Sequence, residues 1–291
     1  MIIVANKSGQ LCNQLILFAH AIATAAESGK KIKHLFGYDF DQYFDFDHEF
    51  GKLILHKDIW KIFWRIEYIR YKESKYFKPI RAILLGRDLK VPTMEESKQI
   101  AQKYREKGIH IILYWQYRDY DALFRQREKL CEIFKPRQQI CQEVSAIVTS
   151  LKKNDDELLI AVHLRRGDYK DWCNGRFYYN DTTYRRWMQA IANSCGKKCT
   201  FVLFSNEKLE QDVFTGHGYR VILAKGDAIH DLYTMASCDY IMGPPSTFSW
   251  WAAFYGNKLY YTLYKEDLIV NLKLFRRVKG EEFNPLRYLE S

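Results

Sequence analysis

The stretch Leu158-Leu-Ile-Ala-Val-His-Leu-Arg-Arg-Gly-Asp168 decides the fold of this chain. Five apolar residues in a row, 158–162, follow the polar and acidic run 152–157. A short apolar run between polar segments predicts a strand that is buried on both faces, as in parallel α/β sheets. In such sheets ligands bind outside the carboxyl ends of the strands, so we expect a binding site directly after this run.

Four polar side chains follow the predicted strand, namely His163, Arg165, Arg166 and Asp168. Two adjacent guanidinium groups are costly to bury unless an anion or carboxylates satisfy them. A phosphate matches the planar donors of arginine. The alternative is a structural ion-pair network with acids such as Asp168 and Asp171. The position at a strand end favours the anion site.

The composition is that of a basic globular protein. The 291 residues are enough for two domains of ordinary size, and hydrophobic and charged residues make up 47% and 27% of them, so wholesale disorder is not expected. A net charge of +10 favours anionic partners such as nucleotides, nucleic acid or an acidic membrane surface. The high aromatic share, 16%, fits ring-lined clefts and ordinary cores alike.

Cysteine usage and hydropathy bear on the cellular compartment. The seven cysteines are odd in number and scattered, which favours reduced thiols over a disulfide framework. Cys195 and Cys199 form the one close pair, and no second pair or histidine cluster completes a zinc site, so we expect no metal. The chain shows neither a signal-peptide pattern nor an apolar run of about 18 residues. We therefore expect a cytoplasmic protein.

Predicted strands and helices alternate along the chain. The first part is predicted to hold strands at 2–5, 31–36 and 109–114 and helices at 13–28, 95–107, 121–134 and 138–152. After the strand at 158–162, further strands are predicted at 200–204, 219–223, 239–242 and 258–263, with helices between them. This alternation predicts two α/β domains, residues 1–150 and residues 151–291, the second a doubly wound nucleotide-binding domain.

Other polar side chains of the second domain suit a nucleotide site. They are Ser205 and Asn206 at a strand end, Asp231 on a helix, and Ser246, Thr247, Phe248 and Ser249 at the start of the next helix. Hydroxyl and backbone N–H groups at a helix start bind phosphate oxygens well. The alternative for the serines is helix capping, which is compatible with ligand binding.

Two features of the first domain allow an ordinary and a functional interpretation. Asn13 and Gln14 follow a loop with one glycine, and Asn13 is either a helix N-cap or a residue that faces a cleft. The basic, aromatic segment 56–87 has an apolar helical face between residues 59 and 69. It is either a packed helix with a solvated basic edge or a surface that rests on anionic lipid. Packed helices are far commoner, which favours the first interpretation of this segment.

Several of these segments resemble one enzyme family. His163-Leu-Arg-Arg-Gly-Asp168 resembles the His-x-Arg-Arg-x-Asp motif of GDP-fucose-dependent fucosyltransferases. The segments 9–15, 204–207, 231–241 and 246–251 are similar to other blocks of that family and stand in the same order. Cys12 stands where the family usually has glycine. The chain thus resembles the α-1,2-fucosyltransferases (glycosyltransferase family 11) and, more distantly, the α-1,6- and protein O-fucosyltransferases.

The resemblance implies a GT-B fold, in which two Rossmann-like domains hold the site in the cleft between them. It implies that Arg165 binds the β-phosphate of the donor GDP-fucose, while Arg166 supports the loop or binds a second phosphate oxygen. His163 and Asp231 would meet the guanosine. The other donor-binding residues would be Ser205, Asn206, Ser246, Thr247, Phe248 and Ser249, with Asn13 and Gln14 in the cleft on the acceptor side.

The implied reaction is inverting, metal-independent transfer of L-fucose to a sugar hydroxyl, α-1,2 to galactose, with no cofactor. Charge that grows on the leaving diphosphate needs fixed cationic donors such as Arg165. The acceptor hydroxyl must lose a proton, and Asp168 and Asp171 are the candidate bases. The implied acceptor is an oligosaccharide or glycolipid, and we expect no nucleic-acid partner. The basic charge favours peripheral contact with the anionic inner face of a membrane.

Two other functions remain open from the sequence. One is a GT-B transferase that uses another nucleotide sugar. The other is a non-catalytic basic protein that binds polyanions with a steep salt dependence.

Overall fold

The apolar run after Glu157 forms strand β4 (Leu158–Leu164), in which every residue after Leu158 is buried. It pairs in parallel with β5 (Cys199–Ser205) on one side and with β7 (Tyr240–Gly243) on the other. The chain order of the strands reverses between β4 and β7. Such a topological switch point is where open α/β sheets bind their ligands.

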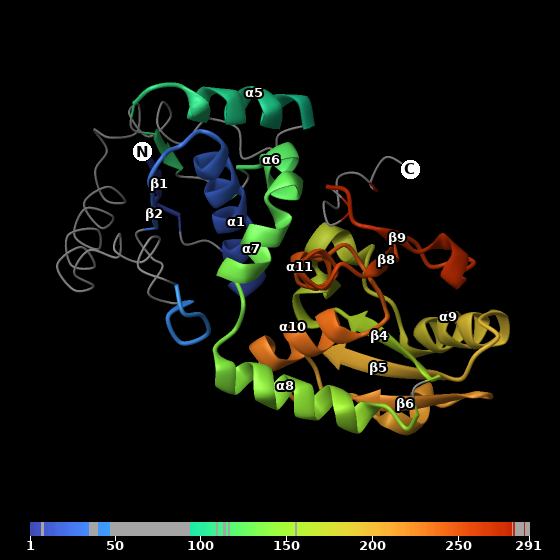
Figure 1. The fold of residues 1–291 in the computed structure, drawn as a ribbon. Coiled ribbons are helices and arrows are strands. Elements are labelled where there is room, and N and C mark those ends of the chain that lie inside the picture. Colours follow the sequence, from blue (N-terminus) through green and yellow to red (C-terminus); the bar gives the residue numbers. More distant parts are fainter. Residues whose placement is uncertain are drawn as a thin grey trace. The chain divides into compact units, whose positions relative to one another are not determined.

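Three further strands complete this sheet. β6 (Tyr219–Leu223) pairs with β5, and β8 (Leu259–Thr262) pairs with β7, both in parallel. The two-residue strand β9 (Arg276–Arg277) joins β8 in antiparallel orientation. The sheet order is therefore β6-β5-β4-β7-β8-β9. Figure 1 shows β4, β5 and β6 side by side. The sequence did not predict β9, because two exposed arginines carry no strand pattern.

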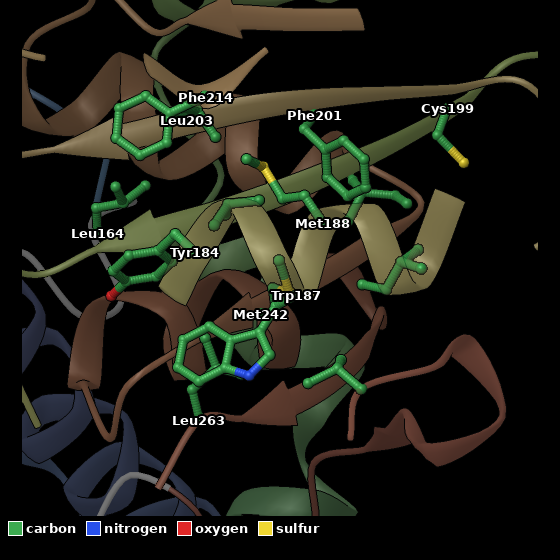
Figure 2. Close-up of a cluster of buried hydrophobic side chains, with 14 of the residues drawn as sticks. Leu164, Tyr184, Trp187, Met188, Cys199, Phe201, Leu203, Phe214, Met242 and Leu263 are labelled. Carbon is green, nitrogen blue, oxygen red and sulfur yellow. The ribbon is translucent and has the colours of Figure 1, made fainter. Parts of the chain in front are cut away.

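Successive residues of the central strands face two different helical layers. On one face lies a hydrophobic cluster, and Figure 2 shows helix α9 (Asp181–Ser194) packed against the strands there. The cluster includes Ile160, Val162 and Leu164 from β4, Phe201 and Leu203 from β5, and Tyr184, Trp187 and Met188 from α9. Because side chains alternate along a strand, His163 faces the opposite layer.

The opposite layer contains helices α8 (Gln138–Leu151), α10 (Ala228–Ser237) and α11 (Thr247–Gly256). Helix α10 packs against both α8 and α11. The chain accordingly divides into two units, Met1–Arg137 and Gln138–Ser291. The sequence placed this boundary after residue 150. The observed boundary lies before α8, because that helix packs on α10 of the second unit.

The first unit is a smaller α/β body. Its three parallel strands, β1 (Ile2–Val4), β2 (Ile32–His34) and β3 (His110–Ile112), lie in the order β2-β1-β3. Helix α1 (Leu11–Glu27) is largely buried and contacts β1 and β2. Parallel sheets in both units confirm the predicted α/β fold class.

Three shorter helices follow in the first unit, α5 (Met94–Arg105), α6 (Tyr120–Arg125) and α7 (Arg127–Ile133). The sequence predicted one helix over 121–134, but Gln126, with φ −92° and ψ 11°, separates α6 from α7. The apolar pattern continues across this kink, so the pattern alone does not reveal it.

The structure is a computed structural model that describes residues 1–6, 9–34, 40–46, 94–108, 110–112, 115, 117–154, 156–280, 282 and 288. The basic, aromatic segment 56–87 lies outside these described residues. Both interpretations of it, a packed helix and a lipid-binding surface, therefore remain predictions. Within the described part of the chain, no helix is long and apolar enough to cross a membrane.

Candidate active site

The turn after β4 is held by the end of β5. Asn206 Oδ1 accepts a hydrogen bond from the Arg166 backbone N–H at 2.9 Å, and Glu207 Oε1 accepts one from the Gly167 N–H at 3.1 Å. Gly167 has a φ of +61°, and a Cβ on it would lie 2.8 Å from Asn206 Nδ2. Ser205 Oγ in turn accepts a bond from the Glu207 N–H. The predicted ligand contacts Ser205 and Asn206 therefore lie against the arginine turn and fix its backbone.

Arg165 lies directly after β4 and pairs with an exposed carboxylate. Its Nη2 is 2.9 Å from Asp168 Oδ1, and its guanidinium lies 5.4 Å from the centre of the Tyr169 ring. The Arg165 side chain is 15% exposed, whereas that of Asp168 is 60% exposed. Water screens an ion pair with so exposed a partner, and such a pair contributes little to stability. A ligand phosphate can therefore replace Asp168 at little cost.

Arg166 is held by the first residue of α9 and by the loop before it. It forms an ion pair with Asp181, and its guanidinium lies 5.6 Å from the centre of the Tyr178 ring. The Arg166 side chain is 11% exposed, and its buried Nε has no hydrogen-bond partner among the described residues. A buried N–H without a partner costs about 1–3 kcal/mol. An oxygen of a bound anion would remove that cost.

His163 occupies the switch point between β4 and β7. A Cβ on Gly243, the last residue of β7, would lie 2.7 Å from His163 Cβ, so the close approach here requires glycine. The imidazole lies 5.3 Å from the Phe248 ring. Burial, with a smaller effect of the Arg165 charge, lowers the pKa of His163 to about 3. The ring is neutral at pH 7, and its buried Nδ1 has no partner among the described residues.

The first turn of α11 follows β7 at the same edge of the sheet. Ser246 is the N-cap of this helix, and its Oγ accepts a hydrogen bond from the Phe248 N–H at 3.2 Å. Thr247 and Phe248 are partly exposed, as a ligand contact requires. Ser249 is fully buried, with Oγ 3.3 Å from Tyr260 Oη. Ser249 thus faces the interior beneath this turn, unlike Thr247.

Asp231 lies in the first turn of α10, which packs on α11. Its Oδ1 accepts a hydrogen bond from the Gly226 N–H at 3.1 Å. Burial raises the pKa of the Asp231 carboxyl to about 6. The group is ionised at pH 7, so it can accept hydrogen bonds from a nucleobase edge.

The two candidate bases lie in the loop after the arginines. This loop forms two short 3₁₀ helices, η3 (Gly167–Lys170) and η4 (Trp172–Gly175), and Asp171 joins them. Both carboxylates are exposed to solvent, and Asp168 pairs with Arg165. Either carboxylate is therefore accessible to an acceptor hydroxyl.

Asn13 and Gln14 belong to the first unit, in the first turn of α1. The N-cap of α1 is Gln10, so the interpretation of Asn13 as an N-cap is wrong. Asn13 packs closely on Gly9, which has a φ of +78°, and Gln14 Nε2 donates a hydrogen bond to Gly9 O at 3.0 Å. Gln14 Oε1 is buried without a partner among the described residues. Both side chains thus shape the loop before α1.

Sequence reasoning missed several residues that hold the site. Gly243 makes the close approach at the switch point, and a glycine at the end of a predicted strand was a usable signal for it. Tyr178, Asp181 and Glu207 hold the arginine turn through contacts between segments distant in sequence. No local pattern indicates such contacts.

These features define a doubly wound α/β unit with two adjacent arginines, Arg165 and Arg166, at the carboxyl edge of its sheet. Within the described residues, no group of histidines, cysteines or carboxylates is arranged to hold a metal ion. The family model for glycosyl transferase family 11 matches residues 2–265. The chain therefore belongs to glycosyltransferase family 11 and is a glycosyltransferase.

Known proteins similar to this chain include both a curated relative and solved structures. An alpha-1,2-colitosyltransferase from Escherichia coli is 24% identical over 279 residues, which cover 88% of each chain. The structure of NodZ α-1,6-fucosyltransferase soaked with GDP-fucose is 14% identical, with a TM-score of 0.56 over 92% of this chain and 97% of that chain. The structure of POFUT1 in complex with GDP is 15% identical, with a TM-score of 0.57 over 90% and 98%. These structures confirm a GT-B-like α/β fold.

Proposed function

We propose that this glycosyltransferase moves L-fucose from GDP-fucose to a sugar hydroxyl, forms an α-1,2 linkage to galactose, and inverts the donor configuration without a metal ion. The observation that carries the proposal is the arginine turn at the switch point, where a buried nitrogen of His163 and one of Arg166 have no partner among the described residues. The similarity to an alpha-1,2-colitosyltransferase and to fucosyltransferase structures supports the donor class and the linkage.

In this proposal the two arginines have different tasks. Arg165 exchanges its solvated partner Asp168 for the β-phosphate and stabilises the charge that grows on GDP as the bond to fucose breaks. Arg166 stays with Asp181, keeps the turn in place and offers Nε to a second phosphate oxygen. The first turn of α11, with Ser246 and Thr247, adds backbone and hydroxyl donors.

The guanosine lies against His163 and Asp231 in this proposal. The Asp231 carboxylate accepts hydrogen bonds from the N–H groups of the guanine edge, which requires the ionised form. His163 is neutral at pH 7, so its ring nitrogens offer one donor and one acceptor without adding charge.

The acceptor is a galactose-terminated oligosaccharide or glycolipid, and the first unit, with Asn13 and Gln14, provides the acceptor side. Asp171 takes the proton of the attacking hydroxyl, and Asp168 is the alternative base. The enzyme acts in the cytoplasm, and its net charge of +10 favours peripheral contact with the anionic inner face of a membrane.

GDP-colitose is the second donor to test, because one relative of this chain is an alpha-1,2-colitosyltransferase. Colitose is L-fucose without its 3-hydroxyl group, so the same phosphate and guanosine contacts serve both GDP sugars. The protein would be incubated with a panel of nucleotide sugars in the presence of a chelator, and nucleotide release and the linkage of the product would be measured.

We expect GDP release from GDP-fucose and an α-1,2 product on galactose. Release only from GDP-colitose would reassign the donor, and release only from a uridine or cytidine nucleotide sugar would contradict the guanosine site. A protein that binds heparin or DNA but releases no nucleotide would instead be a polyanion-binding protein.

A further inference from the structure

Tyr169 is a fixed ring next to the arginine turn. It is 6% exposed, and its hydroxyl donates a hydrogen bond to Pro245 O at 2.6 Å, which ties it to the segment after β7. The Arg165 guanidinium lies 5.4 Å from the centre of this ring. The centre of the Trp172 ring lies 4.5 Å from it. One anchored tyrosine therefore contacts both the indole of Trp172 and the arginine that binds the donor phosphate in our proposal.

Trp172 is the accessible member of an aromatic group. Its two ring neighbours, Tyr169 and Phe177, are buried, and the Phe177 ring lies 5.6 Å away. Trp172 itself is only partly buried. The two buried rings restrict the indole and leave part of its surface for another molecule.

The turn after Trp172 has an unfavourable backbone. Cys173, Asn174 and Gly175 adopt positive φ angles of 51°, 56° and 74° in succession. Residues with a Cβ rarely adopt this left-handed conformation, because the Cβ lies too close to the following carbonyl oxygen. A Cβ on Gly175 would lie 2.9 Å from Lys170 O, so the loop folds back tightly on η3. Backbone strain of this kind is characteristic of functional sites.

We infer that Trp172 is the platform on which the acceptor sugar stacks, an inference that rests on the proposed function. The apolar C–H face of a galactose ring packs on an aromatic surface, while its hydroxyl groups remain at the edges. Asp171, the residue before Trp172, is exposed, so a candidate base is adjacent in sequence to this platform. Trp172 therefore selects and orients the acceptor, and the geometry of the loop sets its position.

In the reaction the acceptor oxygen forms a bond to C1 of the donor sugar. The bond from C1 to the β-phosphate oxygen breaks, GDP leaves with the electron pair, and the hydroxyl proton moves to the Asp171 carboxylate. Trp172 takes no part in these bonds. Its contribution is to binding of the acceptor, so its loss affects the acceptor KM and not the binding of the donor.

The test compares Trp172→Ala and Trp172→Phe with Tyr219→Ala, a partly buried aromatic residue at the opposite, amino end of the sheet. Lactose and N-acetyllactosamine serve as acceptor probes. The measured quantities are the acceptor KM, the donor KM, the release of GDP without acceptor, and the melting temperature.

We expect Trp172→Ala to raise the acceptor KM about tenfold, while Trp172→Phe stays close to the wild type. The donor KM and the release of GDP without acceptor remain at wild-type values in both variants, and Tyr219→Ala leaves the acceptor KM unchanged. An unchanged acceptor KM in Trp172→Ala overturns the inference, and so does a parallel loss of donor binding and melting temperature, which indicates a structural role. A wild type that releases no GDP overturns the proposed function itself and is recognised before any variant is compared.

Discussion

The two ends of the six-stranded sheet each pair an arginine with a carboxylate, but only one end completes its hydrogen bonds. At the amino end, Arg220 Nη2 lies 3.0 Å from Glu157 Oε2, and Arg220 Nε donates to Thr200 Oγ1 at 3.0 Å. Glu157 is 6% exposed and also accepts bonds from Thr200 Oγ1 and from the Lys153 N–H. This closed network joins the segments that begin β4, β5 and β6.

At the carboxyl end, the arrangement is open. Arg165 pairs with Asp168, a carboxylate that is 60% exposed. His163 Nδ1 and Arg166 Nε are buried and have no hydrogen-bond partner among the described residues. Buried polar groups are normally satisfied, so unsatisfied donors and acceptors at one end of a sheet indicate a ligand. An arginine ion pair is present at both ends, so the proposed site is supported by the position of Arg165 and Arg166 at the switch point together with the unpaired nitrogens of His163 and Arg166.

The largest effect is expected from Arg165→Lys. Lysine keeps the charge but loses the planar fork of donors, and removal of one such donor in enzymes costs about a hundredfold in kcat. The pair with exposed Asp168 adds little stability, so the melting temperature should not change. Kinetics and thermal unfolding of the same preparation check both statements. A variant that turns over at the parent rate would remove Arg165 from the mechanism.

Arg220→Ala should give the opposite pattern. The change leaves the nearly buried Glu157 without its cation, and such losses cost about 3–5 kcal/mol in fully buried pairs. Because the Arg220 side chain is 27% exposed, we expect about 2 kcal/mol in the free energy of unfolding, measured with urea. kcat and KM of the folded variant should match the wild type. A stable variant with a selective kinetic defect would show that the amino end also contributes to function.

Donor binding should depend on pH through Asp231. Its pKa is about 6, so the carboxylate is lost as pH falls, and the KM for the donor should rise about tenfold per pH unit below 6. The contribution of Asp231 to the free energy of unfolding changes in the opposite direction with pH. The folded-state pKa lies above the unfolded value, so protonation of Asp231 favours the fold, and its contribution to stability falls as pH rises from about 4 to about 6. Weaker donor binding at pH 5 is therefore not unfolding.

The control for this pH dependence is Asp231→Asn. This variant has no titrating carboxyl at the position, so its donor KM should be raised at pH 7 and should stay nearly level between pH 7 and pH 5. A pH profile that keeps the wild-type shape in Asp231→Asn would assign the titration to another group.

The smallest effect is expected from Gly243→Ala. The new Cβ would meet His163 Cβ at 2.7 Å, so β4 and β7 must separate slightly at the switch point. Overpacking of this kind costs about 1–3 kcal/mol, and we expect the lower value because the contact lies at the strand ends. The donor KM should rise severalfold through the displaced imidazole. Unchanged stability and unchanged kinetics would mean that the strand ends tolerate the methyl group.

The sequence predicted the elements that depend on local pattern. The apolar run of β4 and the later strands were found near their observed positions, because a buried parallel strand is apolar throughout. Helices α6 and α7 were predicted as one helix, and β9 was missed, because neither the break at Gln126 nor the pairing of β9 with β8 shows in the local pattern. The boundary between the units was placed too late because α8 is assigned by its packing on α10 and not by its composition.

The sequence also indicated which residues gather at the carboxyl end, but not how they contact one another. His163, Arg165 and Arg166 lie at the switch point, as the strand pattern predicts. Asn206 binds the backbone of the arginine turn, and Ser249 faces the interior. Both contacts depend on the tertiary structure, because each side chain meets a partner from another element. Their predicted roles at the donor, like those of Asn13 and Gln14 at the acceptor, remain predictions.

Calorimetric titration with GDP in the presence of a chelator tests the central claim most directly, namely that the carboxyl end of the sheet binds the nucleotide through arginine. The account predicts one GDP per chain in the wild type and in Arg220→Ala, and binding at least tenfold weaker in Arg165→Ala. Equal GDP affinity in the wild type and Arg165→Ala, or binding that appears only after a divalent metal is added, would contradict it.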